Sequence, residues 1–241
     1  MASLFKLVGW ICGILLLWAY FQLPSGSPDV ASRQILSVSE EADRIVLGWS
    51  GPVQEPMSER VAAAFDRYKA DRRRLVLLLN SPGGSIEHGR RVVAAIRANG
   101  RAIDTLVQKA GVCGSMCVPI FLAGAERIAD PEAYFMFHEA SLNGSGKEIV
   151  KQSVTESVRE NNKRQPIPAS EDAAVSEAVK AIETQVTDDF FRNDIGIRGV
   201  NKVWLAGMRR KISGRDIWMS AQQLADEGSG IVDRLIGAPA R

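Results

Sequence analysis

The chain has 241 residues, 46% of them hydrophobic and 24% charged, with a formal net charge of +2. This composition is ordinary for a globular protein and argues against a nucleic-acid-binding surface. The densest basic run, Arg72 to Arg74, lies at an expected helix-to-strand junction and is interpreted as a solvated turn. Without its N-terminal segment the chain keeps about 200 residues, enough for one well-buried domain but not for two.

The N-terminal segment from Leu4 to Leu23 contains a single charge, Lys6, followed by about 17 mostly apolar residues. That length is short for a membrane-spanning helix and long for a secretory signal, and an A-x-A-type cleavage site is missing. Trp18 and Tyr20 lie near its far end, as in an aromatic membrane-interface belt. We therefore expect residues 1–23 to be a retained signal anchor or transmembrane helix, with a cleaved signal peptide as the alternative.

Lys6 sets the expected orientation, because positive charge is kept on the cytoplasmic side. The rest of the chain would then be exported. We expect a single-pass inner-membrane protein with its folded domain on the periplasmic, extracytoplasmic side.

Residues 24–42 are rich in Pro, Ser and Gly and are expected to form a linker. The part that follows alternates strands and helices. Strands are expected at 44–49, 75–79 and 103–107, and helices at 58–69 and 86–98. The run LVLLL has the continuous apolar pattern of a strand buried on both faces of a parallel sheet. This alternation predicts right-handed β-α-β crossovers and an α/β fold.

The second half is expected to continue the same domain, which we place at 43–241. The predicted elements are a helix from the turn at 111–115 to about Leu122, strands at 127–129, 134–137, 216–219 and 231–236, and helices at 175–191, 203–208 and 220–228. Residues 141 to about 170 turn polar and are interpreted as an exposed excursion. The whole of 141–210 is treated as a variable helical region.

Ser115 is the candidate nucleophile. Gly111 and Gly114 permit a sharp turn from strand to helix, and a helix N-terminus offers free N–H groups. A serine hydroxyl needs a base to take its proton and donors to stabilise the oxyanion. The backbone N–H of Met116 is well placed to be one such donor.

The sequence NSPGG, Asn80 to Gly84, ends the buried LVLLL strand and is a candidate second donor. Pro82 presets a turn, and Gly83 and Gly84 let the backbone approach a ligand closely with N–H groups exposed. Together with the turn at Ser115, this loop predicts an oxyanion hole.

The chain has two histidines, so the choice of a base is narrow. His138 follows the apolar FMF, which would hold it beside the sheet, and imidazole is the usual general base near neutral pH. His88 lies early in a predicted helix next to Glu87 and close to Arg90, a setting typical of a surface histidine.

The sequence has three cysteines, two of which flank Ser115 symmetrically. Cys113 and Cys117 either form a disulfide in an oxidising compartment or pack as small buried residues, and both interpretations stay open. A CxxxC pair without a histidine or a second pair is a poor metal site, so we expect no metal. No Walker-type ATP-binding loop is present in the sequence, and no cofactor is expected.

Five stretches resemble the proteolytic subunits of the Clp protease family within the Clp/crotonase fold. They are RIVLGWSGPV, LVLLLNSPGGSIEHG, VCGSMCVPIFLAGA, YFMFHEA and GRDIWMSAQQLADEGSGIVDRLI. The resemblance implies a repeated β-β-α spiral with a mostly parallel sheet flanked by helices, and a serine-type endopeptidase. The N-terminal apolar segment and the CGSMC turn are similar to an exported, membrane-anchored bacterial offshoot.

Carried over residue by residue, the resemblance makes Ser115 the nucleophile and His138 the base, with Met116 and Gly83 or Gly84 as oxyanion amides. The third catalytic residue departs from the family, because the expected aspartate position falls at about Ile212. Asp216 is the nearest acid and is the candidate for orienting His138. The less favoured candidates are Asp188, Asp189 and Asp194.

The segment between His138 and Asp216 is also longer than in the family, where this region builds contacts between subunits. A homo-oligomer is expected, but not necessarily the usual stacked rings. The expected partners are a peptide or protein substrate and the membrane, and not nucleic acid.

The leading hypothesis is a membrane-tethered serine peptidase. A catalytically degenerate scaffold that binds a peptide or protein is the first alternative, and a Ser-Lys peptidase using Lys109 is the second. An acyl-CoA enzyme of the crotonase branch is least favoured, because it would not need this serine and export would separate it from its substrate.

Overall fold

The computed structural model describes residues 34–142, 144–162, 171–197 and 199–237. The chain divides into two units, Met1–Arg33 and Gln34–Arg241, and all described residues belong to the second. The expected membrane segment and most of the expected linker therefore lie outside the described residues. None of the helices in the described ranges is both long enough and apolar enough to cross a membrane.

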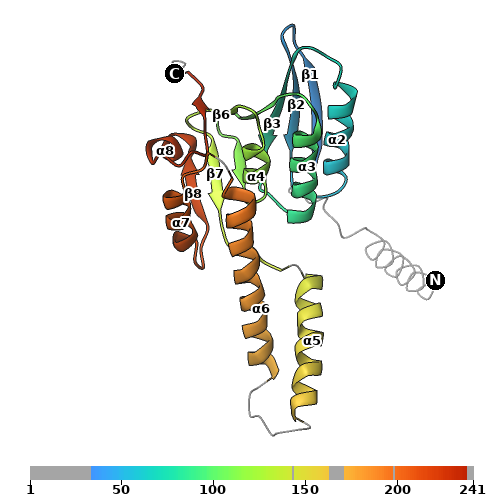
Figure 1. Ribbon diagram of the computed structural model, residues 1–241, viewed down its shortest axis with the longest axis vertical. Coiled ribbons are helices and arrows are strands. Elements are labelled where there is room, and N and C mark those ends of the chain that lie inside the picture. The colour runs from blue at the N-terminus through green and yellow to red at the C-terminus, as the bar shows by residue number, and fades with distance from the viewer. Residues whose placement is uncertain (1–33, 143, 163–170, 198, 238–241) are drawn as a thin grey trace, which may run out of the picture. The chain divides into compact units, whose positions relative to one another are not determined.

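The main sheet has six strands in the order β1-β2-β3-β4-β6-β9 (Figure 1). Their bounds are β1 Ile35–Glu40, β2 Arg44–Ser50, β3 Arg74–Asn80, β4 Ile103–Val107, β6 Arg127–Ala129 and β9 Arg234–Leu235. β1 pairs antiparallel with β2, and all other pairs are parallel. β3 lies between β2 and β4, and its LVLLL run is largely buried, as expected for an inner parallel strand.

A second, three-stranded sheet lies beside the turn that carries the candidate nucleophile Ser115. It consists of β5 Val112–Gly114, β7 Tyr134–Phe137 and β8 Ile217–Ser220, in the order β5-β7-β8. β5 and β7 are parallel, whereas β7 and β8 are antiparallel. An isolated bridge between Ser81 and Cys113 joins the end of β3 to β5 and so brings the two sheets together.

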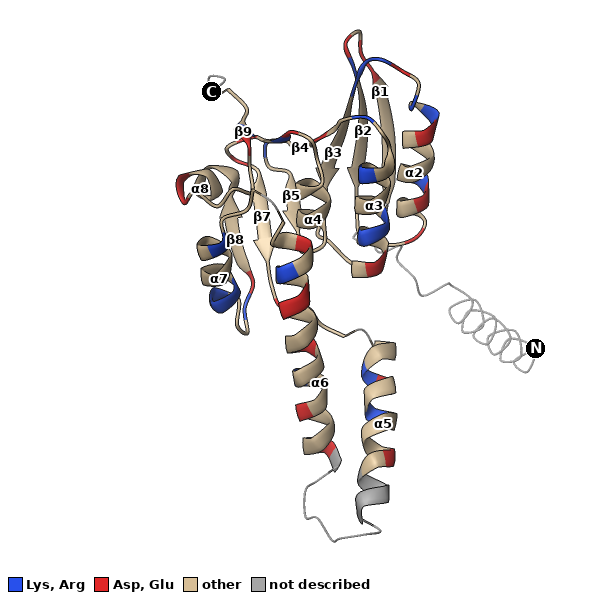
Figure 2. Cartoon of the chain, viewed as in Figure 1, with Lys and Arg blue, Asp and Glu red and all other residues tan. Residues whose placement is uncertain are grey.

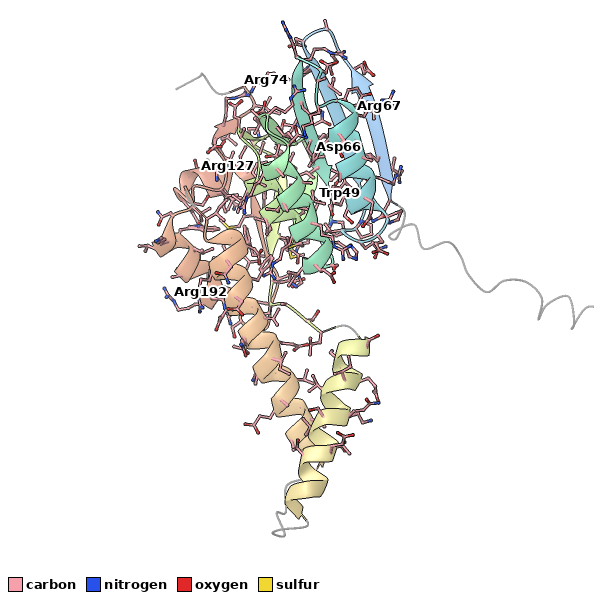
Figure 3. All side chains as sticks on the ribbon, turned by 45° about the vertical axis from the view of Figure 1, so that its right-hand side comes forward. Trp49, Asp66, Arg67, Arg74, Arg127 and Arg192 are labelled. Atoms are coloured by element: carbon pink, nitrogen blue, oxygen red, sulfur yellow. A yellow bond between two sulfur atoms is a disulfide. The ribbon has the colours of Figure 1, made fainter. Side chains whose placement is uncertain are left out.

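Helices α2 Met57–Arg67, α3 Ile86–Ala98 and α4 Cys117–Leu122 share one hydrophobic core with these strands. α2 and α3 contact each other and direct their charged residues outward (Figure 2). Trp49 of β2, labelled in Figure 3, is among the largest fully buried side chains. The short α4 is buried along its whole length, which places the turn that precedes it against the core.

The C-terminal half adds α5 Gly144–Asn162, α6 Glu171–Asp189, the π-helix η2 Phe190–Ile195, α7 Lys202–Lys211 and α8 Ala221–Asp226. α5 and α6 pack side by side as a helical pair (Figure 1). α6 continues into η2, whose Phe190 and Phe191 are buried in the main core. The helical pair is therefore joined to the domain through its second helix.

The predicted mixed α/β architecture is confirmed, and the differences are local. Residues 35–40, expected within the linker, form the antiparallel edge strand β1. Their side chains are mostly exposed, and the strand is held by backbone pairing with β2. Residues 144–162, interpreted as a polar excursion, form α5, whose helix is stabilised by packing on α6 rather than by a strong apolar face of its own. The last expected strand shortens to β9, which among the described strands pairs with β6 alone.

Candidate active site

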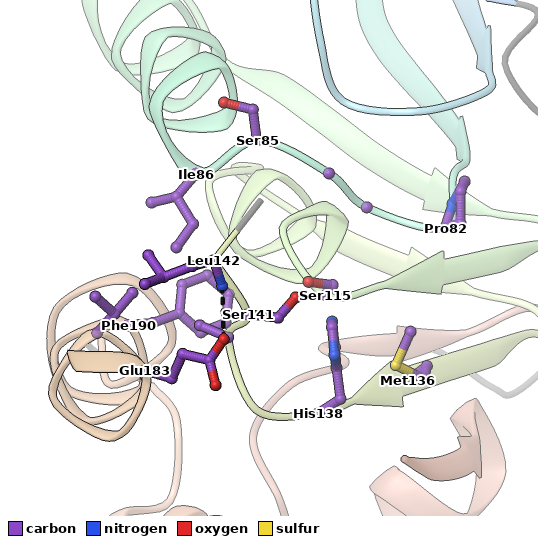
Figure 4. A pocket seen from close by; sticks show the side chains of 14 residues that line it. Pro82, Ser85, Ile86, Ser115, Met136, His138, Ser141, Leu142, Glu183 and Phe190 are labelled. Carbon is purple, nitrogen blue, oxygen red and sulfur yellow. Dashed lines mark hydrogen bonds between the residues drawn. The ribbon is translucent and has the colours of Figure 1, made fainter. Parts of the chain in front are cut away.

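A cleft of about 680 Å³ lies where the loop after β3, the turn before α4, the end of β7 and the C-terminal part of α6 meet (Figure 4). Ser115, His138, Gly83 and Gly84 all line it. Its apolar wall is formed by Ile86, Leu142, Val186 and Phe190. The structure thus brings together the four cleft residues that the sequence motifs singled out on separate segments.

Ser115 sits in a sharp turn with a left-handed backbone conformation, φ +50°. A non-glycine residue in this region costs on the order of 1 kcal/mol and needs its surroundings to hold it. Three backbone hydrogen bonds of 2.9 Å do so: the N–H of Ser115 donates to Met136, that of Gly114 to Ser81, and that of Val118 to the Ser115 carbonyl. The turn therefore presents the Ser115 side chain to the cleft (Figure 4).

A disulfide joins Cys113, in β5, to Cys117, the first residue of α4. Both residues are fully buried, and their Cα atoms are 5.1 Å apart. Ser115 lies midway along the five-residue segment that the disulfide closes.

The glycine loop lies directly against this turn. A Cβ atom added to Gly83 would lie 2.6 Å from Ser115 Cβ and 3.0 Å from the Met116 nitrogen. Gly83 and Gly84 have φ +97° and +146°, conformations that favour glycine. Within the described residues, the N–H groups of Gly84 and Met116 have no hydrogen-bond acceptor, whereas the Gly83 N–H donates to Ser81 Oγ at 3.2 Å. Two free amide donors therefore belong to the loop and the turn that flank Ser115.

His138 follows the buried Phe137 at the end of β7, and its ring extends toward Ser115 (Figure 4). In the described part of the chain the ring makes no hydrogen bond to a carboxylate. The segment after it is held by α6: Thr187 Oγ1 accepts from the Ala140 N–H, and Glu183 Oε1 accepts from the Leu142 N–H, both at 2.9 Å. α6 thus fixes the chain that leaves His138.

Asp216 directly precedes β8, the strand that pairs with β7. Phe137 of β7 pairs with Ile217 of β8, so the next antiparallel pair would be His138 and Asp216. Asp216 is exposed and does not line the cleft. Ile212, at the position expected for the family's aspartate, is fully buried at the end of α7.

The other candidate acids are engaged elsewhere. Asp188 pairs with Arg209 at 2.7 Å, Asp194 with Arg90 at 2.6 Å, and Asp189 with Arg192 at 3.7 Å. These three carboxylates serve ion pairs rather than the His138 ring.

Lys109 is not placed to act as a base. Its ammonium lies 2.8 Å from the Glu132 carboxylate, and the side chain is 67% exposed and does not line the cleft. The hydrogen bond to Glu132 raises the pKa of Lys109, whereas a lysine base needs a lowered pKa. The geometry therefore disfavours the Ser-Lys alternative.

Among the described residues, the group with metal-ligand spacing is Glu55, Glu59 and His88, whose ligand atoms lie within 4.8 Å of one another. Arg91 already pairs with both carboxylates, at 3.8 and 3.6 Å. The His88 Nδ1 lies 3.3 Å from Ser58 Oγ, so this histidine belongs to a surface network of polar groups.

The wall supplied by α6 was missed by sequence reasoning. The helical periodicity of 175–191 predicted a helix but not that Glu183, Val186 and the following Phe190 line the cleft. One sequence feature could have indicated this role: the helix lies in the sequence between the candidate base His138 and the candidate acid Asp216.

Comparison with known proteins places these observations in a family. Residues 31–193 match the family model described as Clp protease. Among solved structures, a ClpP1 point mutant from Listeria monocytogenes is 18% identical, with a TM-score of 0.49, over 80% of this chain and 91% of that one. A comparison with curated proteins found no match.

Proposed function

Since the chain belongs to the Clp protease family, a family of serine peptidases, we propose that it hydrolyses peptide bonds through an acyl-enzyme on Ser115. One observation carries this proposal: Ser115, in its left-handed turn, shares a cleft with the His138 ring and the Gly83-Gly84 loop. A strained nucleophile beside a base and unpaired amide donors is the arrangement that acyl transfer needs.

In the proposed mechanism the His138 imidazole takes the proton of Ser115 Oγ as the hydroxyl attacks the peptide carbonyl. The N–H of Met116 and that of Gly84, or of Gly83 after leaving Ser81 Oγ, stabilise the oxyanion. His138 then returns the proton to the leaving amine, and a water molecule releases the acyl group by the same path. The apolar wall of the cleft would hold a side chain of the peptide.

Asp216 is the proposed orienting acid for His138. Its support is the Phe137–Ile217 pair, beyond which an extended antiparallel register would bring His138 to Asp216, and the engagement of the other candidate acids with arginines. A carboxylate so placed would fix the tautomer and stabilise the imidazolium that forms.

The proposed location is the extracytoplasmic side of the inner membrane, with residues 1–23 as a single-pass anchor. This rests on the apolar Leu4 to Leu23 segment and the position of Lys6. The Cys113–Cys117 disulfide agrees with an oxidising compartment. The proposed partners are a peptide or protein substrate and further copies of the chain.

The test is covalent labelling of the purified protein with a fluorophosphonate. We expect labelling of the natural protein, loss of labelling in Ser115→Ala, and unchanged labelling in Ser157→Ala, whose hydroxyl lies on α5 outside the cleft. A folded natural protein that does not label would overturn the proposal.

A second candidate is a scaffold of the same fold that binds peptides without cleaving them. Buried Ile212 at the expected acid position and the His138 ring without a carboxylate partner in the described residues favour it. Peptide binding by a folded protein that resists fluorophosphonate would support this candidate.

A further inference from the structure

The Cys113–Cys117 disulfide spans the turn that carries the proposed nucleophile. Cys113 lies in β5 and Cys117 opens α4, so the covalent bridge ties the strand before Ser115 to the helix after it. Neither cysteine lines the cleft, and both are fully buried. The bridge therefore acts on the reaction only through the backbone that it encloses.

The backbone inside the bridge includes the two groups that matter for acyl transfer. Ser115 holds its left-handed φ of +50°, and the Met116 N–H has no acceptor among the described residues. Hydrogen bonds fix the N–H groups of Gly114 and Ser115 to Ser81 and Met136. The Met116 N–H shares a planar peptide unit with the Ser115 carbonyl, which accepts from the Val118 N–H at 2.9 Å. Its direction therefore depends on this hydrogen bond and on the turn that the bridge constrains from both ends.

We infer that the disulfide is a positioning element, which holds Ser115 Oγ and the Met116 N–H in their productive orientation. Without the bridge, the backbone hydrogen bonds of the turn are left to oppose the relaxation of Ser115 toward the negative φ that serine prefers. That rotation would turn both the hydroxyl and the following amide away from the cleft. The inference rests on the proposed function for its consequence, but not for its geometry.

The chemistry makes activity depend on the redox state in which the chain folds. Reduction breaks the S–S bond with two electrons and two protons from a dithiol, which becomes a disulfide itself and leaves two cysteine thiols. Because both sulfurs are buried, a folded oxidised molecule resists this exchange. A chain still in a thiol-rich compartment would keep two thiols and a turn without the bridge. In the exported chain, a disulfide oxidant would accept two electrons and two protons from these thiols and become a dithiol, and activity would rise as the bridge forms.

The test compares full-length proteins in detergent by the rate of fluorophosphonate labelling. In the double variant Cys113→Ser/Cys117→Ser we expect kinact to fall about tenfold or more with KI unchanged, because a donor is misplaced while the cleft remains. The matched control is Cys12→Ser, which removes the remaining cysteine and leaves the turn intact. Circular dichroism and Tm must show that each protein is folded at the assay temperature.

A second comparison uses the natural protein, in which the disulfide can be broken and formed again. Refolded with a dithiol reductant it should label as slowly as the double variant, and reoxidation should restore the rate, which a merely structural loss in the variant would not predict. This comparison also replaces the double variant if that protein does not fold. Labelling at the natural rate in the folded double variant or in the reduced protein would overturn the inference.

A second readout does not depend on catalysis. The chain has six methionines, so selective ¹⁵N-methionine labelling gives few amide signals, and Met116→Leu identifies the one of interest. In protein refolded with the dithiol reductant, the Met116 signal should differ from that of the oxidised protein, while the signal of Met57, on α2, should not. An unshifted Met116 signal would overturn the inference. A shift in a protein that never labels would support the brace while overturning the proposed peptidase.

Discussion

At the scale of single residues, Gly83 shows how closely the chain packs around the turn of the proposed nucleophile, Ser115. Its missing side chain lets the loop after β3 lie against Ser115 and Met116, with a free amide on either side. This contact joins two segments that are separate in sequence into one proposed oxyanion site.

Gly83→Ala should lower stability and abolish labelling, because its Cβ would overlap Ser115 Cβ and its φ is +97°. We expect a loss of about 2–3 kcal/mol in urea unfolding. Gly100→Ala is the matched control, since Gly100 has φ +77° but no atom near its added Cβ. It should lose about 1 kcal/mol from strain alone and keep its labelling rate. Equal effects of the two substitutions would contradict the close approach at Gly83.

Asp216→Asn tests the orienting acid. If Asp216 holds the His138 ring, labelling should slow about 10- to 100-fold, less than for a buried triad acid because Asp216 is exposed. Asp194→Asn, which only breaks the ion pair with Arg90, should label normally. An unchanged rate in Asp216→Asn would leave His138 to act without this acid.

At the scale of elements, α6 contributes to the cleft, a role that its sequence pattern did not predict. Its C-terminal part forms one wall of the cleft, and Thr187 and Glu183 tether the chain that leaves His138. The helical pair of α5 and α6 is therefore mechanically connected to the proposed base.

Thr187→Val tests whether α6 holds the chain that leaves His138. Thr187 is fully buried, and its loss leaves the Ala140 N–H without its acceptor, at a cost of about 1–3 kcal/mol. Thr184→Val is a close control, because both threonines donate to a carbonyl one turn earlier on the same helix but only Thr187 accepts from the loop. We expect slower labelling in Thr187→Val alone, measured below the Tm of both variants.

At the scale of the whole domain, an ion pair ties the C-terminal segment to the main sheet. Arg127 of β6 (labelled in Figure 3) is 9% exposed and pairs with Asp233, just before β9. Asp233 also accepts a hydrogen bond from the Arg127 backbone N–H at 3.0 Å. This contact closes the six-stranded sheet at its last strand.

Asp233→Ala should therefore destabilise the domain by about 3 kcal/mol, because it leaves a buried guanidinium without its counter-charge. Glu132→Ala breaks the exposed pair with Lys109 and should change stability by less than about 1 kcal/mol. Urea denaturation of both variants measures the difference. A small loss of stability in Asp233→Ala would mean that the Arg127 guanidinium becomes hydrated when its partner is removed.

The sequence by itself determined the local parts of this protein. Ser115, the glycine loop and the apolar strand before it were predicted because turn chemistry and hydrophobic periodicity act over a few neighbouring residues. The α/β alternation followed for the same reason. The sequence also limited the base to two histidines.

Only the tertiary structure decided which distant segments meet. The strand register pairs Phe137 with Ile217, the neighbours of His138 and Asp216, and Ile212 is buried in the core at the end of α7. A helix pattern shows that α6 has a packed face but not that this face closes the cleft. The choice between a disulfide and two packed cysteines also depended on the three-dimensional turn, because bridging requires two Cα atoms to approach. Local propensity depends on neighbouring residues, whereas these contacts form only when distant segments of the chain pack around one core.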